Sequence, residues 1–286
     1  MARDPKPITI HDLRRMKQRG EKITMVTCYD NATARIVDEV GVPLILIGDS
    51  LGMVMLGHDS TLRVTLDMLV HHTRAVTRAA RRSLVVMDLP FATYSAADLP
   101  LSLASAKRAI AEGGAQAVKI EGGRRMAPVI GTLVASGIPV MGHIGLTPQS
   151  IHMIGGYRVQ GRGQEAADRL RKAALALEEA GAFAIVLECV PAALARSLSD
   201  ELTVPTIGIG AGPACDGQVQ VMHDLLGLID GFQPRHAKRY ADLASAIREA
   251  ITAYHDEVRS GAFPSRDHAF DMDDLLGDAE FQPPNP

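Results

Sequence analysis

The chain has 286 residues, of which 47% are hydrophobic and 22% charged, and its formal net charge is −3. This composition supports a sizeable core, and the near-neutral charge gives no reason to expect binding to nucleic acid or to an anionic membrane. No uncharged apolar stretch reaches the roughly 18 residues of a membrane-spanning helix, and the charged first 20 residues do not read as a signal peptide.

Short apolar runs alternate along the chain with longer segments of helical periodicity. Runs of a few residues with nearly continuous hydrophobicity are typical of strands that are buried on both faces, as in a parallel sheet. A helix is expected first, over residues 9–20. Seven strands are expected at 23–28, 44–49, 84–90, 117–122, 139–145, 184–189 and 205–210, and helices at 31–41, 66–82, 96–114, 124–137, 164–181 and 216–229.

An eighth unit is expected as a strand within 233–240 followed by a helix over 241–258. Eight such units over about 250 residues predict a (β/α)₈ barrel. A doubly wound open sheet is the structural alternative, but it needs fewer strands and usually a Gly-rich first turn, whereas the first turn here is TCYDNAT.

We therefore expect residues 1–263 to form one barrel domain with an N-terminal helix. The acidic, proline-ended tail at 264–286 is expected to be flexible or to pack on a neighbouring subunit. The three cysteines, Cys28, Cys189 and Cys215, have no metal-binding spacing, which suits reduced thiols and a cytoplasmic location.

Polar side chains stand where the expected strands end. In a parallel barrel all these carboxyl ends open onto one mouth, where the active sites of this fold lie. The fourth strand carries an ammonium and a carboxylate two residues apart, hence on one face of the strand. In strand order, the residues are Asp49, Asp88, Lys119 with Glu121, His143, and Glu188.

Three carboxylates that converge on one mouth need a counter-charge, which a divalent cation supplies. Because Asp49, Asp88 and Glu121 offer only oxygen, the pattern favours Mg²⁺ over Zn²⁺. Lys119 suits a substrate carboxylate or oxyanion, and Glu188 is left as a general base.

Structural roles are the alternative for each of these residues. A carboxylate that ends a strand is often a helix N-cap or a turn residue. His143 also suits a hydrogen-bonded structural histidine, and Lys119 suits an ion pair with Glu121 alone. The glycines at 207–212, IGIGAG, give only a weak phosphate-binding signal because the GxGxxG spacing is missing.

Several long segments resemble the ketopantoate hydroxymethyltransferase family. The likeness extends from Thr9 to Phe270, and its many segments in order make it far more specific than any single motif. The segments are GDSLGMVMLGHDST (48–61), DLPF (88–91), VKIEGG (118–123), GHIGLTPQS (142–150), GGYRVQGRG (155–163), LECVP (187–191), IGIGAG (207–212) and DGQVQVMHDLLG (216–227).

The resemblance implies a barrel of the phosphoenolpyruvate/pyruvate type. It implies transfer of a hydroxymethyl group from 5,10-methylenetetrahydrofolate to 3-methyl-2-oxobutanoate through a Mg²⁺-stabilised enolate, giving 2-dehydropantoate for pantothenate and coenzyme A synthesis. It implies large homo-oligomers, typically decamers. It places Mg²⁺ at Asp49, Asp88 and Glu121, the oxo-acid at Ser50 and Lys119 with His143 close to it, and proton abstraction at Glu188.

Two other functions are compatible with the residues. One is a Mg²⁺-dependent C–C lyase acting on an oxo-acid, for which a catalytic cysteine in a Lys-Lys-Cys-Gly-type loop is expected; none of the three cysteines has that context. The other is a barrel that binds an anionic metabolite without catalysis, and such a protein would not exchange a proton of its ligand.

Overall fold

Eight parallel strands form a closed barrel in the computed structural model, which describes residues 6–229 and 234–270. Each strand pairs with its neighbours in chain order, and β8 closes the barrel against β1. The strands are β1 (Ile23–Thr27), β2 (Leu44–Ile47), β3 (Leu84–Asp88), β4 (Ala117–Glu121), β5 (Val140–Gly145), β6 (Ala184–Glu188), β7 (Thr206–Ile209) and β8 (Gly217–Gln220). The predicted (β/α)₈ barrel is confirmed.

Helices that follow β1 to β6 cover the outside of the barrel: α2 (Asn31–Val40), α4 (Leu66–Thr77), α5 (Leu99–Ala111), α6 (Ala127–Ala135), α8 (Gln164–Glu179) and α9 (Ala192–Glu201). Two further helices lie elsewhere, α1 (Ile10–Gln18) before β1 and α11 (Leu243–Ser260) after β8. Three short helices lie in loops: α3 (Leu51–Val54), α7 (Ile151–Ile154) and α10 (Met222–Leu226). None of the helices in 6–229 and 234–270 is long and apolar enough to cross a membrane.

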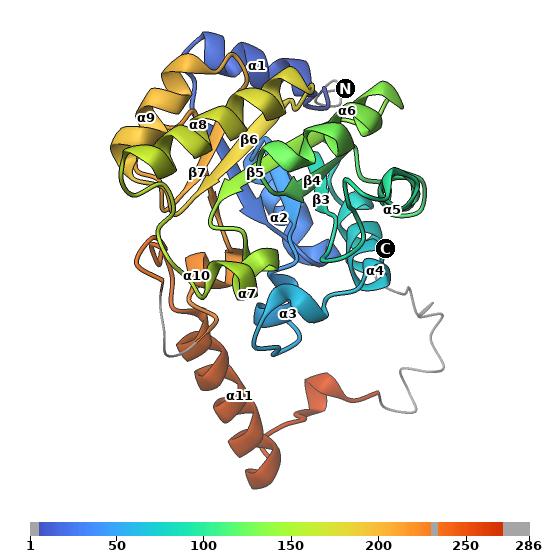
Figure 1. Ribbon diagram of the computed structural model, residues 1–286. Helices are drawn as coiled ribbons and strands as arrows, with labels where there is room; N and C mark the ends of the chain where they lie inside the picture. The colour runs from blue at the N-terminus through green and yellow to red at the C-terminus, as the bar shows by residue number, and fades with distance from the viewer. Residues whose placement is uncertain (1–5, 230–233, 271–286) are drawn as a thin grey trace.

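The barrel interior is a packed core of its own. Inward-facing residues such as Met25, Leu46 and Met141 are buried there, which is how side chains fill a barrel of this fold. Leu13 of α1 belongs to the same cluster, so the N-terminal helix closes one end. Thr9 and Asp12 begin α1 with a reciprocal capping box. Figure 1 shows α1 at one end of the barrel and α3, α7 and α10 at the other.

The prediction for the eighth strand is wrong. Residues 234–240 form a turn and irregular chain, and β8 lies at Gly217–Gln220, inside the segment expected to be helical. Only Met222–Leu226 of that segment is helical. The strand is short and carries polar side chains, among them Gln218 on its exposed side, so it lacks the apolar run of a strand covered on both faces.

The last helix also departs from a regular barrel helix. The helix expected over 241–258 is present as α11, but none of its residues, all within the described part, is buried. Figure 1 shows α11 extending away from the barrel on the side of α3 and α10. Most of the expected tail, residues 271–286, lies outside the described residues.

Candidate active site

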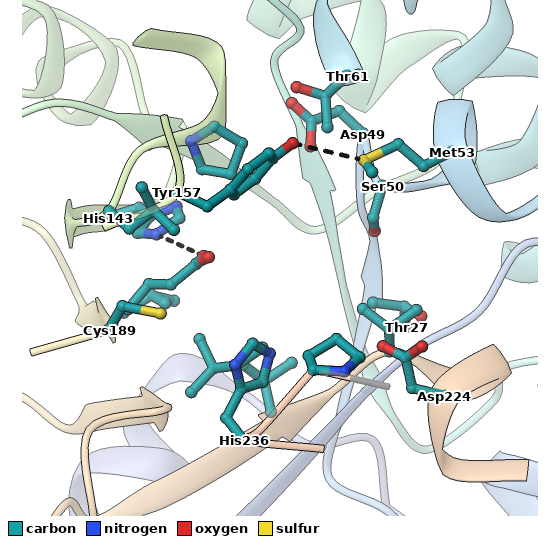
Figure 2. A pocket seen from close by; sticks show the side chains of 18 of the residues that line it. Thr27, Asp49, Ser50, Met53, Thr61, His143, Tyr157, Cys189, Asp224 and His236 are labelled. Carbon is teal, nitrogen blue, oxygen red and sulfur yellow. Dashed lines mark hydrogen bonds and ion pairs between the residues drawn. The ribbon is translucent and has the colours of Figure 1, made fainter. Parts of the chain in front are cut away.

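The carboxyl ends of β2 to β6 bring the predicted residues together at one mouth. Strand register places Asp88 beside Lys119, and Glu121 beside His143. Glu188 ends β6, opposite Gly145 of β5. A cavity of about 640 Å³ opens there, and every residue of the predicted set lines it: Asp49, Ser50, Asp88, Lys119, Glu121, His143 and Glu188. Figure 2 shows this cavity with Asp49, Ser50 and His143 around it.

Lys119 lies between charged groups in the buried part of the site. Its Nζ is 2.8 Å from Asp88 Oδ1 and 3.2 Å from His143 Nδ1. Burial opposes the charge, but Asp88, Glu121 and Asp49 together outweigh burial and hold the pKa of Lys119 above its ordinary value. The ammonium therefore stays protonated at neutral pH. The lysine does more than pair with Glu121, because its ion-pair partner is Asp88.

His143 connects the two glutamates. Its Nδ1 is 3.4 Å from Glu121 Oε1, and its Nε2 is 3.2 Å from Glu188 Oε2, the contact drawn in Figure 2. Burial and Lys119 lower the pKa of His143, yet the two glutamates prevail and raise it to about 9. The imidazole thus lies within ion-pair distance of the Glu188 carboxylate at the cavity wall.

The ionised forms of the two aspartates are disfavoured in this site. Burial, followed by the charges of Asp88 and Glu121, raises the pKa of Asp49 well above its ordinary value. Burial also raises the pKa of Asp88, although Lys119 partly offsets it. Burial acts in the same direction on Glu121, but His143 and Lys119 outweigh it and lower its pKa.

The carboxylates contact protein groups rather than converging on one point. Asp88 Oδ2 accepts from the Asp49 amide at 3.0 Å, and Asp49 Oδ2 accepts from the Gln149 side chain at 2.8 Å. Accordingly, within 6–229 and 234–270 no group of three or more His, Cys, Asp or Glu side chains is arranged as a ready metal-ligand set.

Gln149 and two tyrosines are part of the site although the sequence did not single them out. The backbone amide of Gln149 donates to Glu121 Oε2 at 3.0 Å, and its side chain donates to Asp49, so this residue links Glu121 to Asp49. Tyr94 donates to the Gln149 side chain, and Tyr29 contacts the Ser50 hydroxyl at 2.9 Å. The two tyrosines come from loops and Gln149 from a short 3-10 helix, without a spacing that could have identified them. Only Gln149 lies in a segment that carries the family likeness.

Gly145 allows β5 and β6 to approach at the base of Glu188. It has a φ of 95°, and a Cβ there would lie 2.1 Å from the Glu188 carbonyl oxygen. That carbonyl accepts from the Leu146 amide at 2.8 Å. The glycine therefore fixes the backbone from which the Glu188 side chain reaches the cavity.

Comparisons with known proteins agree with this architecture. The family model described as ketopantoate hydroxymethyltransferase matches residues 7–266. A relative from Chloroflexus aggregans, 3-methyl-2-oxobutanoate hydroxymethyltransferase, is 58% identical over 93% of this chain and 94% of its own length. A protein of the same name from Geotalea daltonii is 55% identical over 93% of this chain and 99% of its own.

Solved structures share the fold at low sequence identity. Phosphonopyruvate hydrolase in complex with oxalate and Mg²⁺ is 14% identical, with a TM-score of 0.58 and 94% of both chains covered. A 2,3-dimethylmalate lyase of the PEP mutase/isocitrate lyase superfamily is 16% identical, with a TM-score of 0.56 and 93% of both chains covered. With the family model spanning nearly the whole barrel and relatives this similar, the chain belongs to the ketopantoate hydroxymethyltransferase family.

Proposed function

We propose that the protein transfers a hydroxymethyl group from 5,10-methylenetetrahydrofolate to 3-methyl-2-oxobutanoate, giving 2-dehydropantoate, and that it does so in the cytoplasm. The observation that carries the proposal is the meeting of Lys119, His143 and Glu188 with three carboxylates at one barrel mouth, in a chain of this family. The three free thiols are consistent with the cytoplasmic location.

The residues fit a Mg²⁺ ion in their chemistry. Asp49, Asp88 and Glu121 offer only oxygen donors, and burial, with a smaller effect of neighbouring carboxylates, raises the pKa of both aspartates; a dication would favour their ionised forms. When bound, the ion would supply Lewis-acid polarisation of the substrate's keto oxygen. A fold relative solved with oxalate and Mg²⁺ is consistent with this proposal.

The chain's own side chains account for the remaining chemistry. Lys119 provides a fixed positive charge for the substrate carboxylate or for the oxygen that becomes negative when the C3 proton leaves. Ser50 lies beside Asp49 at the cavity and binds the acid. Glu188, beside His143, takes the C3 proton, and the resulting carbon nucleophile forms a bond to the methylene carbon of the folate. Water replaces the C–N bonds of that carbon and supplies the hydroxyl oxygen, and tetrahydrofolate leaves.

The full reaction tests this proposal. Protein, Mg²⁺, 3-methyl-2-oxobutanoate and 5,10-methylenetetrahydrofolate labelled with ¹³C in the transferred carbon are expected to yield 2-dehydropantoate that carries the label, detected by mass spectrometry. Absence of labelled product from folded, metal-loaded protein would rule the function out.

Replacing Lys119 with alanine is expected to lower kcat/KM for the oxo-acid by about 10²–10³-fold, because a buried charge that faces the developing oxyanion is lost. Steady-state kinetics at varied oxo-acid concentration measure the change. Lys172→Ala removes an exposed lysine of α8 and serves as the control, with kinetics expected to match the wild type. An unchanged kcat/KM in folded Lys119→Ala would reduce the lysine to a partner of Asp88.

We also propose that the protein forms a homo-oligomer, as the family likeness implies. Four apolar side chains on one face of α11, at helical spacing, are between 46% and 62% exposed: Ile247, Ile251, Tyr254 and Val258. A continuous apolar stripe of this kind on an uncovered helix marks a surface for association.

Light scattering is expected to give a mass several times the 30.6 kDa of one chain. Ile251→Lys should shift the mass toward the monomer, because it places a charge in the stripe. Glu249→Lys introduces the same side chain on the opposite face of α11 and should leave the mass unchanged. A monomeric wild-type protein at micromolar concentration would contradict the oligomer.

A further inference from the structure

The cavity extends well beyond the cluster of charges that suits a small oxo-acid. Its volume of about 640 Å³ is in the range for a drug-sized ligand. In Figure 2, Asp224 and His236 lie across the open space from Tyr157 and His143. This distal side of the cavity combines apolar residues with three polar ones: Val219, Val221, Ile229 and Pro234, together with Asp224, Arg235 and His236.

Asp224 is the one carboxylate among these residues. It lies in α10, directly after β8, and its carboxylate is partly buried. Within the described part of the chain no hydrogen bond or ion pair satisfies its oxygens. Burial raises its pKa, while the charges of His236, His223 and Arg239 act in the opposite direction and favour the ionised form. The carboxylate lines the cavity and can accept hydrogen bonds from a bound ligand.

A role in capping α10 does not account for Asp224. The amide of Met222 at the start of α10 donates to Thr27 Oγ1 at 3.0 Å, so a residue of β1 already serves that end of the helix. The helix has only five residues, which leaves little helix dipole for a carboxylate to stabilise.

We propose that Asp224 binds the pterin ring of the folate co-substrate, accepting hydrogen bonds from the ring N3–H and the 2-amino group with its two oxygens. This inference rests on the proposed function. A 2-amino-4-oxopyrimidine ring presents two parallel N–H donors on one edge. They can donate to the two oxygens of a carboxylate in the way that an arginine guanidinium does. The apolar walls formed by Val219, Val221 and Ile229 suit the faces of a flat ring, which would extend toward the reacting acid at Lys119 and Glu188.

Calorimetric titration with tetrahydrofolate, which binds without donating a carbon, tests the assignment. Asp224→Asn is expected to weaken tetrahydrofolate binding by about 10- to 100-fold, since hydrogen bonds to a charged group are lost. Binding of 3-methyl-2-oxobutanoate should change less than about twofold, because its ligands are on the other side of the cavity. Asp67→Asn makes the same change in the first turn of α4 and should bind both ligands as the wild type does.

A tetrahydrofolate analogue with methyl in place of the 2-amino group gives a second test. Its binding to the wild type can be compared with that of tetrahydrofolate even if Asp224→Asn does not fold, and the folded variant completes a double-mutant cycle. The wild type should bind the analogue at least about 10-fold more weakly than tetrahydrofolate, and Asp224→Asn should hardly distinguish the two. If the wild type binds tetrahydrofolate and the analogue with equal affinity, the assignment of Asp224 is wrong. It is also wrong if the variant and the wild type bind tetrahydrofolate equally well. Neither result would contradict the proposed function. A wild type that binds no tetrahydrofolate would instead overturn the proposed function with it.

Discussion

Glu188→Gln is expected to lower kcat by about 10²–10⁴-fold, the usual contribution of a general base. The amide keeps the shape of the side chain and its contact with His143 Nε2, 3.2 Å from the carboxylate in the wild type, but it cannot accept the C3 proton. Hydroxymethyl transfer is measured as product formation. Because Asp49, Asp88 and Glu121 remain, Mg²⁺ affinity should stay close to that of the wild type.

Three outcomes separate the roles open to Glu188. Loss of catalysis with metal and oxo-acid binding retained identifies the base. Loss of Mg²⁺ affinity together with activity would make Glu188 a metal ligand. Full activity would make it a structural charge. Glu179→Gln, the same change on the exposed surface of α8, is the control and should be indistinguishable from the wild type.

Removal of divalent metal is expected to abolish turnover, and added Mg²⁺, Mn²⁺ or Co²⁺ is expected to restore it. Without a dication the site would lack the Lewis acid that is expected to polarise the keto oxygen of the substrate. Activity is measured after chelation and again after each metal is added, with elemental analysis of the chelated protein. Full turnover by protein shown to be metal-free would refute the metal requirement.

Variants then locate the metal. Asp88→Asn should weaken Mg²⁺ binding in a calorimetric titration, because it removes a charged oxygen donor from the buried cluster. Asp67→Asn, at an aspartate that is 80% exposed in its ion pair with Arg108, should leave Mg²⁺ binding unchanged.

Much of the site could be predicted because barrel geometry converts chain position into spatial position. Once strands at 44–49, 84–90 and 117–122 are expected, their last polar residues must share one mouth. Asp49, Asp88, Lys119 and Glu121 do line one cavity. The alternation of side chains along β4 likewise places Lys119 and Glu121 on the same face of that strand.

The features that the sequence did not predict depend on contacts between distant residues, which the local hydrophobic pattern does not encode. β8 was missed because a four-residue strand with Gln218 and Gln220 lacks a continuous apolar run, and the apolar residues around it also suit a helix. Gln149 reaches Asp49 from a loop a hundred residues away in sequence, and only the closed fold brings them together. Asp224 depends in the same way on β8 closing the barrel against β1.

Exchange of the C3 proton of 3-methyl-2-oxobutanoate in D₂O, followed by proton NMR with Mg²⁺ and without folate, tests whether Glu188 is the base. The C3 proton signal should disappear with the wild-type protein and persist with Glu188→Gln, since the base at the mouth acts before the one-carbon unit is needed. A signal that persists with metal-loaded wild-type protein, while the acid is shown to bind, would contradict catalysis by Glu188 and leave a barrel that binds an anionic metabolite without catalysis.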